Sequence, residues 1–244
     1  MAEASRCLIM KNRVLVTGIG RSGTKYMSSV LTESGLACGH EALFDWRTKK
    51  LPSWRGKTAE SSWYATPWLS HYGDTVLKIH LVRHPLDWLS SWVDTVWVKR
   101  SSGTFVALEH ATGIDWHKRA DRDPVNAAME LWVLWNGLID KYADMRLQVE
   151  AITSCDIQKA MRHTRASFSE ETITAALENV PTHVNSRPHA HYKWSHCEGK
   201  PHAQEFGDLA VLCGYPKLAS HKPHQLGPCR TQAVHMACGP PTVT

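Results

Sequence analysis

A glycine-rich loop near the start of the chain combines three glycines with cationic and hydroxyl side chains. Residues 13–31 read RVLVTGIGRSGTKYMSSVL, in which Gly18, Gly20 and Gly23 form a G-x-G-x-x-G pattern. A strand that ends in such a loop and continues into a helix makes an anion site, because backbone N–H groups point inward and the helix dipole adds partial positive charge. The residues expected to hold the anion are Arg21, Ser22, Gly23, Thr24 and Lys25.

Two common phosphate ligands fit this loop only in part. A dinucleotide site needs an acidic residue ~20 positions further on, at the end of a second strand; Glu41 has this separation, but GLACGHE (35–41) is a poor strand sequence. A kinase loop needs lysine directly before its serine or threonine, whereas Thr24 and Lys25 stand in the reverse order. Such kinases also carry an acidic residue in a second motif, the Walker B motif, which Glu150 imitates only weakly. A dinucleotide-binding oxidoreductase and a P-loop kinase that uses ATP and Mg²⁺ remain the alternatives.

A third interpretation keeps the loop and needs no metal. A sulfuryl group in transfer carries less negative charge than a γ-phosphoryl group, so fixed donors and one arginine can stabilise it without a divalent ion. Arg21 lies inside the loop, where its guanidinium group can reach bridging or non-bridging oxygens. We therefore expect no metal at this site.

A second cationic motif follows a strand predicted at 75–83. In LVRHPLDWLSSW, Arg83 stands at the end of that strand and Ser91 lies eight residues later in the next helix. Ligands of open α/β sheets bind outside the carboxyl ends of the strands. Arg83 and Ser91 are therefore expected to contact a second phosphate, the first through its charge and the second through its hydroxyl group.

Together the two motifs resemble those of sulfotransferases that use 3′-phosphoadenosine 5′-phosphosulfate (PAPS). GIGRSGTKY is similar to the 5′-phosphosulfate loop of that family, and LVRHPLDWLSS is similar to its 3′-phosphate motif. The motifs occur in the family's order, about 60 residues apart. CGHE, which ends at Glu41, resembles with a one-residue gap the segment that carries the catalytic glutamate in the protein-tyrosine branch. The resemblance covers roughly residues 13–215.

The resemblance implies a metal-independent, in-line transfer of a sulfuryl group from PAPS to a hydroxyl or amine. In this scheme residues 22–25 hold the 5′-phosphosulfate, and Arg83 and Ser91 hold the 3′-phosphate. Glu41 would be the base, and Arg21 would stabilise the charge on the departing phosphate. The acceptor is expected to be a small molecule or a carbohydrate and not a nucleic acid; the sequence does not identify it.

Two histidine-containing stretches are predicted to be structural. KIH at 78–80 imitates the triplet that carries the base in the cytosolic hormone-type branch of the family, but it lies in the strand that leads to Arg83. His80 is therefore predicted to be a core histidine. The stretch NSRPHAHYKWSHCEGKPH (185–202) has no standard zinc spacing and is predicted to be a solvated loop.

Apolar periodicity predicts an alternation of strands and helices. Strands are expected at 13–17, 75–83 and 145–152, and helices at 23–34, from Pro85, from Asp123-Pro124 with an inner face that runs to Tyr142, and after an N-cap at Ser169. Residues 99–123 are polar and aperiodic, which favours a long loop over the site. The alternation predicts an α/β fold of the P-loop type, a single domain with a mostly parallel sheet and helices on both faces.

Composition sets the remaining expectations. The chain has 244 residues and a formal net charge of +5, which favours an anionic ligand but is too small to indicate nucleic acid. Its seven cysteines form no C-x-x-C pair, and no apolar run reaches the ~20 residues of a membrane span, so a cytoplasmic protein is expected. The predicted parts are an N-terminal extension (1–12), a sulfotransferase domain (13–215) and a loosely structured tail (216–244). The oligomeric state is not predicted.

Overall fold

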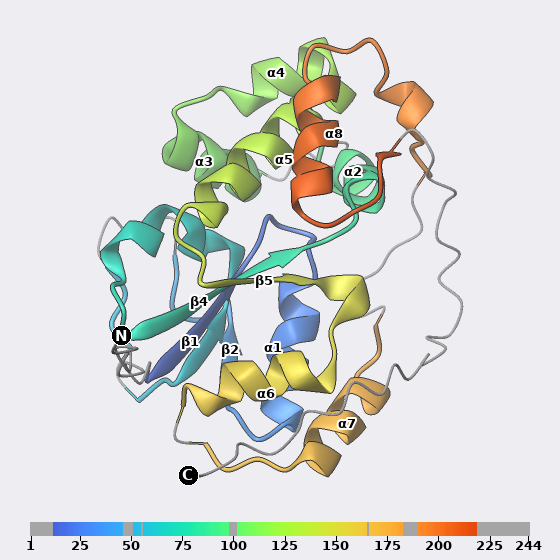
Figure 1. Cartoon of the computed structure of the whole chain (residues 1–244). Helices are drawn as coiled ribbons and strands as arrows, with labels where there is room; N and C mark the ends of the chain where they lie inside the picture. Colours follow the sequence, from blue (N-terminus) through green and yellow to red (C-terminus); the bar gives the residue numbers. More distant parts are fainter. Residues whose placement is uncertain are drawn as a thin grey trace, which may run out of the picture.

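A parallel sheet runs through the middle of the protein (Figure 1). The computed structural model describes residues 12–45, 51–54, 56–97, 102–164, 166–182 and 190–218, so the N-terminal extension up to residue 11 and the tail from residue 219 lie outside the described residues. The five strands that it describes are β1 (Arg13–Thr17), β2 (Cys38–His40), β3 (Ala59–Ser61), β4 (Val76–Val82) and β5 (Met145–Gln148). They lie in the order β2-β3-β1-β4-β5, and every described pair is parallel. The expected α/β class is confirmed.

The central strands β1 and β4 supply side chains to two separate cores, because successive residues of a strand point to opposite faces of the sheet. In β1, Val14 and Val16 enter one core and Leu15 enters the other. The first core is covered by α1 (Thr24–Glu33), α6 (Ser154–Arg162) and α7 (Glu170–Asn179), and the second by α2 (Pro85–Trp92), α5 (Pro124–Asp140) and α8 (Ala203–Leu212). Figure 1 shows these two helical layers on opposite faces of the sheet, as predicted.

The second core is rich in tryptophan. Trp88 and Trp92 of α2 stack with ring centroids 5.1 Å apart, and Trp132 and Trp135 of α5 are equally buried. Aromatic side chains of this size bury roughly 150–250 Å² each. They fix α5 and α2, the helix that carries Ser91, against the sheet.

Most helix starts follow from local sequence. Pro85 occupies the first turn of α2, where its missing N–H has no intrahelical partner to lose. Asp123 accepts a hydrogen bond from the Asn126 N–H at 3.0 Å and begins α5, and Ser169 begins α7 in the same way. These three starts were predicted from the sequence.

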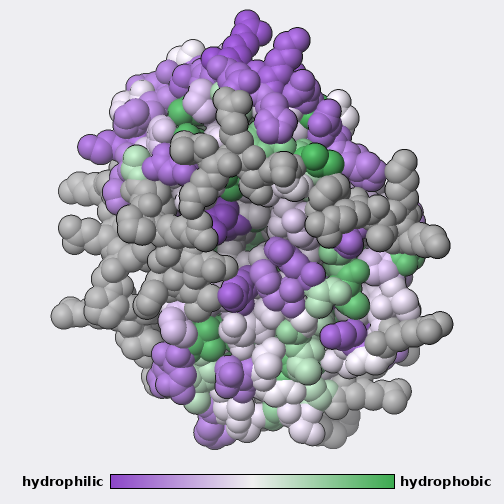
Figure 2. Space-filling model, turned by 180° about the vertical axis from the view of Figure 1, so that it is seen from behind, coloured by the Kyte–Doolittle hydropathy of each residue, from purple (hydrophilic) through white to green (hydrophobic). Residues whose placement is uncertain are grey.

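The predicted long loop over residues 99–123 is wrong. Residues 102–122 form α3 (Ser102–Thr112) and α4 (Trp116–Arg122). Phe105 and Trp116 enter the tryptophan-rich core, while the remaining side chains of α4 are mostly charged. In α3 the described buried side chains, Phe105, Ala107 and Leu108, are confined to one turn, and α4 buries only Trp116, so neither helix has an apolar stripe that repeats over several turns. The surface at the α3–α4 end of the molecule is correspondingly hydrophilic (Figure 2).

Three further differences concern one additional strand and the ends of two elements. GLACGHE does contain a strand, β2, because Cys38–His40 pairs with β3 at the edge of the sheet. The strand predicted at 145–152 ends at Gln148 and continues as a 3-10 turn, η3 (Val149–Ala151). Tyr142 lies beyond the end of α5 and is 41% exposed, so it does not belong to the inner face of that helix.

Three other short helical segments complete the fold: the 3-10 helix η1 (Trp63–His71), the π-helix η2 (Val93–Trp97) that extends α2, and the 3-10 turn η4 (Trp194–His196). None of the helices in the described part of the chain is long and apolar enough to cross a membrane.

Candidate active site

The two motifs singled out in the sequence meet at one edge of the sheet. β1 lies between β3 and β4, so the chain leaves β1 toward one side of the sheet and later returns to its other side. In open α/β sheets such a reversal leaves a crevice at the carboxyl ends of the strands. The glycine loop follows β1 directly, and Arg83 follows β4 directly. The topology therefore brings the two motifs to the same edge of the sheet.

Two glycines of the loop are required by its packing. A Cβ atom on Gly18 would lie 2.3 Å from the Leu81 carbonyl oxygen, which belongs to the neighbouring strand. Gly23 has φ +91°, and a Cβ atom there would lie 2.7 Å from Cγ2 of Val149. Only glycine fits either position without moving the surrounding backbone or side chains.

The loop is held from the α2 side by an indole. Trp88 donates its Nε1 hydrogen to the Gly20 carbonyl oxygen at 2.7 Å. Sequence reasoning did not assign this contact, although a tryptophan in an otherwise apolar helix signals a buried N–H that needs an acceptor. Arg21 follows with φ +74°, a conformation that is rare outside glycine. The loop thus has one fixed shape before any ligand binds.

The N-terminus of α1 has no side-chain cap. Gly23 occupies the N-cap position, and the first turn contains no acidic residue. By contrast, α5, α6 and α7 are all capped by side-chain oxygens. Ser22 is fully buried, and its Oγ has no hydrogen-bond partner among the described residues. An uncapped helix start beside a buried hydroxyl group can receive an anion.

The other two loop residues behave differently. Lys25 is exposed. The Thr24 hydroxyl lies 3.3 Å from Nε2 of His40, which comes from the end of β2. The Thr24 hydroxyl therefore already has a protein partner, whereas the Lys25 side chain lies on the surface.

Arg21, Arg83 and Ser91 are joined to one another. Arg21 donates its Nε hydrogen to Oγ of Ser91 at 3.0 Å, and Arg83 donates from Nη1 to the Arg21 carbonyl oxygen at 3.2 Å. Ser91 is 1% exposed. The structure thus gives Ser91 and Arg83 contacts within the protein that the sequence did not predict, and these contacts fix the conformation of Arg21.

Glu150 closes the other side of this cluster. Its Oε1 accepts a hydrogen bond from the His84 N–H at 2.7 Å, and its Oε2 accepts one from the Tyr215 hydroxyl at 3.0 Å. Burial raises the pKa of Glu150, and the positive charge of Arg83 is among the weaker influences that lower it. Both carboxylate oxygens of Glu150 are thus used in hydrogen bonds that hold the residues around Arg83. The described contacts give no further support to Glu150 as the acidic residue of a kinase's second motif.

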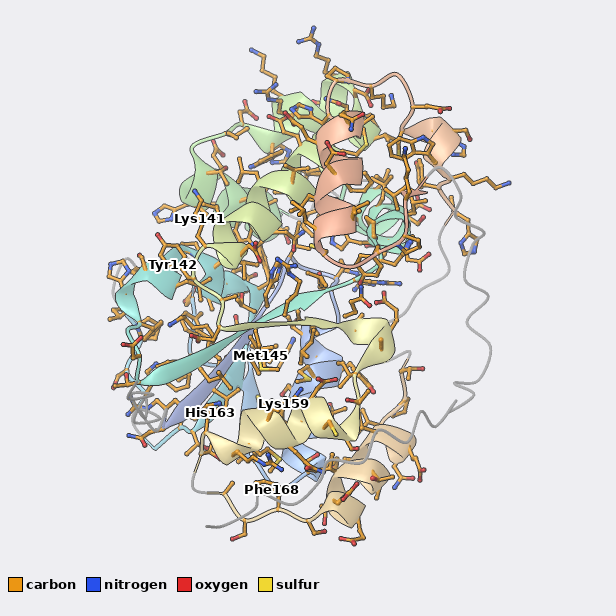
Figure 3. All side chains as sticks on the ribbon, viewed as in Figure 1. Lys141, Tyr142, Met145, Lys159, His163 and Phe168 are labelled. Carbon is orange, nitrogen blue, oxygen red and sulfur yellow. The ribbon has the colours of Figure 1, made fainter. Side chains whose placement is uncertain are left out.

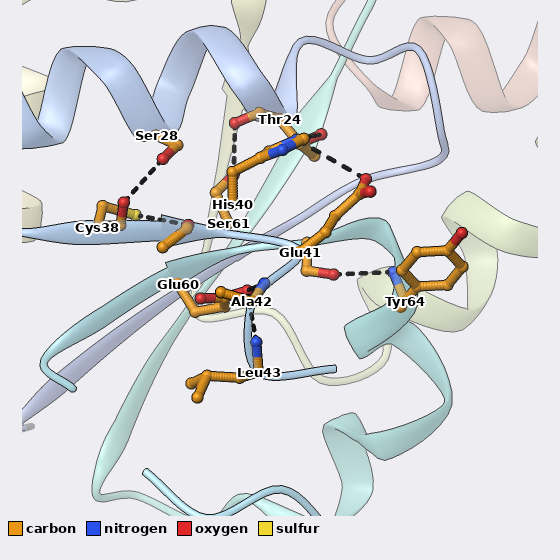
Figure 4. A network of polar contacts seen from close by, with 12 residues as sticks. Thr24, Ser28, Cys38, His40, Glu41, Ala42, Leu43, Glu60, Ser61 and Tyr64 are labelled. Carbon is orange, nitrogen blue, oxygen red and sulfur yellow. Dashed lines mark hydrogen bonds and ion pairs between the residues drawn. The ribbon is translucent and has the colours of Figure 1, made fainter. Parts of the chain in front are cut away.

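Glu41 projects from the turn after β2 (Figure 4). Its Oε1 lies 3.7 Å from Nε2 of His40, which in turn reaches Thr24 at the start of α1. Burial raises the pKa of Glu41, and the nearby Glu60 raises it further. Burial lowers the pKa of His40, as does the charge of Lys25. A carboxylate and a largely neutral imidazole therefore lie beside the glycine loop.

Sequence reasoning missed Glu60. It stands in the middle of β3, is fully buried, and accepts hydrogen bonds from the backbone of the turn that carries Glu41 (Figure 4). The available signal was a charged residue at the start of ESSW (60–63), a stretch whose role the sequence left unresolved. A charge at a fully buried strand position requires a specific partner.

The sequence made predictions for two histidine-containing stretches. His80 is a core residue as expected: it is fully buried and its Nε2 pairs with Oδ1 of Asn136 at 2.9 Å. In the His-rich stretch, the described residues 190–202 contain the turn η4, and residues 183–189 lie outside the described residues. The described part of the chain contains no group of three or more His, Cys, Asp or Glu side chains with metal-site geometry.

A separate hollow lies between β5 and α6. This shallow depression has a volume of about 500 Å³, and Met145, Lys159 and His163 lie close together in it (Figure 3). Asp144, Arg146 and Asp156 also line it. Its charges are of both signs, and it contains neither the glycine loop nor Arg83, so it does not form part of the candidate site.

No family model, no curated protein and no solved structure matches this chain. The motifs and the geometry of the site are therefore the observations that bear on its function.

Proposed function

We propose that this protein is a sulfotransferase that moves the sulfuryl group of PAPS to a hydroxyl or amine acceptor. One observation carries the proposal: Arg21, Arg83 and Ser91, which belong to two distant motifs, are hydrogen-bonded together next to the uncapped start of α1. Two guanidinium groups and a helix N-terminus in one crevice suit a ligand with more than one anionic group. PAPS has such groups at its 5′ and 3′ positions.

The donors present fit this ligand chemically. The loop N–H groups and the buried Ser22 hydroxyl would hold the 5′-phosphosulfate. Arg83 uses one of its five N–H donors on the Arg21 carbonyl and keeps others for a phosphate. Ser91 accepts a hydrogen bond from Arg21, so its own hydroxyl proton is available for donation to the 3′-phosphate.

The reaction would use residues that the fold already orders. PAPS supplies an electrophilic sulfur and a phosphate leaving group. As the acceptor oxygen or nitrogen forms its bond to sulfur, the bridging S–O bond breaks and the acceptor proton passes to Glu41. Arg21 stabilises the negative charge left on the phosphate. Burial of Glu41 raises its pKa, which brings the carboxylate closer to the pKa of an efficient general base.

A ligand panel tests the proposal by thermal shift. The product 3′-phosphoadenosine 5′-phosphate (PAP) should raise Tm in the presence of a metal chelator, and a Kd tenfold below the ligand concentration adds ~1.4 kcal/mol of stability. Adenosine 5′-phosphate, which lacks the 3′-phosphate, is the matched control and should act more weakly. A shift with ATP-Mg²⁺ but not PAP would instead support a kinase, and a shift with NAD alone would support an oxidoreductase.

A further inference from the structure

Glu60 is a buried carboxylate whose surroundings are fitted to it. The residue is 0% exposed in β3, between β1 and the edge strand β2. Its Oε1 accepts hydrogen bonds from the N–H groups of Ala42 at 2.6 Å and Leu43 at 3.1 Å, while Oε2 has no partner among the described residues. A Cβ atom on Gly39 would lie 2.0 Å from Oε2, so the glycine in β2 makes room for this carboxylate.

The two N–H groups that Glu60 binds belong to a strained turn. Glu41 adopts φ +54°, in the left-handed region, and its own N–H donates to the Ser61 carbonyl oxygen at 3.2 Å. A non-glycine residue in that region costs roughly 1–2 kcal/mol. The turn directs the next two N–H groups toward one point, and the Glu60 carboxylate occupies that point. Charge-assisted hydrogen bonds of this kind offset the backbone strain.

We propose that Glu60 is a positioning residue: its carboxylate holds the strained turn from which Glu41 reaches His40 and the start of α1. The assignment of Glu41 as the base rests on the proposed function, whereas the hold on the turn does not. Glu60 touches the backbone of the turn and acts on the reacting atoms only through Glu41.

The charges around the pair support this arrangement. Burial raises the pKa of Glu41, and Glu60 raises it further. Burial also raises the pKa of Glu60, while its two backbone hydrogen bonds and Lys57 lower it. His40 lies beside Glu41, and the positive charge of Lys25 acts on His40. Burial raises the pKa of the Cys38 thiol to about 12, so this thiol stays neutral. An ionised Glu60 therefore makes proton binding by Glu41 more favourable.

Two substitutions separate the structural hold from the charge. In Glu60→Gln the amide oxygen still accepts the two backbone hydrogen bonds, but the negative charge is gone. In Glu60→Ala the acceptor is also lost. Glu33→Gln, which removes an exposed carboxylate at the end of α1, is the matched control. Carbon-13 titration of the Glu41 carboxyl group in labelled protein reports on the turn without any acceptor substrate.

We expect the Glu41 titration to move to lower pH in Glu60→Gln and to stay unchanged in Glu33→Gln. In Glu60→Ala the amide resonances of Ala42 and Leu43 should shift, and the turnover of sulfuryl transfer should fall at least tenfold with PAP affinity within twofold of wild type. Amide resonances of Ala42 and Leu43 that are identical in wild type, Glu60→Gln and Glu60→Ala overturn the proposal. If Glu60→Ala does not fold, Glu60→Gln decides, because a neutral amide oxygen accepts more weakly than a carboxylate and should still shift both resonances. If PAP does not bind at all, the proposed function fails, and the two amide resonances still test the hold of Glu60 on the turn.

Discussion

Arg21 donates its Nε hydrogen to Oγ of Ser91, at 3.0 Å and across 70 residues of sequence. The bond connects the glycine loop after β1 to the helix after β4. Because Ser91 is almost fully buried, it can fix the guanidinium group of Arg21 before any ligand arrives. A preorganised charge contributes more to transition-state stabilisation than one that must be ordered during the reaction.

Ser91→Ala removes the acceptor of this bond. We expect the variant to lose about 1 kcal/mol of stability, the usual net contribution of one hydrogen bond, and to bind PAP more weakly because Arg21 is less ordered. Denaturant unfolding and calorimetry measure the two effects. Ser70→Ala, an exposed serine of η1, is the control. Wild-type affinity for PAP in Ser91→Ala would show that the bond has no role in the ligand site.

Arg83→Ala should weaken PAP binding by ~1.5–3 kcal/mol, the scale of hydrogen bonds to charged groups. The control Arg162→Ala removes an exposed arginine from α6 and should leave the affinity unchanged. Isothermal titration calorimetry distinguishes them. Equal affinity in both variants would restrict Arg83 to its structural hydrogen bond with the Arg21 carbonyl.

Gly18→Ala places a methyl group 2.3 Å from the Leu81 carbonyl oxygen, so β1 and β4 must separate locally. We expect a loss of ~1–3 kcal/mol in the free energy of unfolding, typical of overpacking. Gly137→Ala is the matched substitution in the middle of α5, where no atom lies within 4 Å of the new Cβ. It should stabilise the protein by up to ~1 kcal/mol through helix propensity. Equal effects of both substitutions in urea titrations would contradict the packing argument.

Glu41→Gln should lower kcat by ~10²–10⁴-fold, the usual contribution of a general base, with little change in PAP affinity. The amide keeps the size and polarity of the side chain. Transfer from radiolabelled PAPS to a panel of hydroxyl and amine acceptors measures the loss. Near-wild-type turnover would rule out Glu41 as the base and direct attention to His40, which lies between Glu41 and Thr24.

His80 should make the protein less stable in mild acid. Burial lowers the pKa of His80, so the folded protein holds it neutral, whereas in the unfolded chain it titrates at roughly 6.5. The unfolded state then binds more protons as the pH falls below that value, and stability decreases. Between about pH 7.5 and about pH 5, wild type should therefore lose more stability than His80→Gln. The exposed His71→Gln is the control. Parallel pH profiles for wild type and His80→Gln would contradict this expectation.

Three partly desolvated carboxylates act in the opposite direction. Burial raises the pKa values of Glu41, Glu60 and Glu150, so the folded state binds their protons more readily than the unfolded chain does. Their contribution to stability increases as the pH falls through those raised values. The difference in stability between wild type and His80→Gln cancels this contribution, whereas the pH profile of wild type alone contains both effects.

The sequence by itself determined the features that depend on neighbouring residues. Short runs rich in Val, Ile and Leu identified β1 and β4, Pro85 and Asp123 marked the starts of α2 and α5, and the glycine spacing identified the loop. Each of these features depends on local backbone sterics, on a cap a few residues away, or on a period of two or 3.6 residues.

Only the tertiary structure decided the features that depend on distant partners. Cys38–His40 becomes a strand because β3 lies beside it, and α3 is helical because Phe105 finds the tryptophan-rich core. Ser91 meets Arg21, and Glu60 meets the turn at Glu41, only after four strands have taken their places in the sheet. Such contacts require chain segments up to 70 residues apart to converge, and no local spacing encodes the distance or the direction between them.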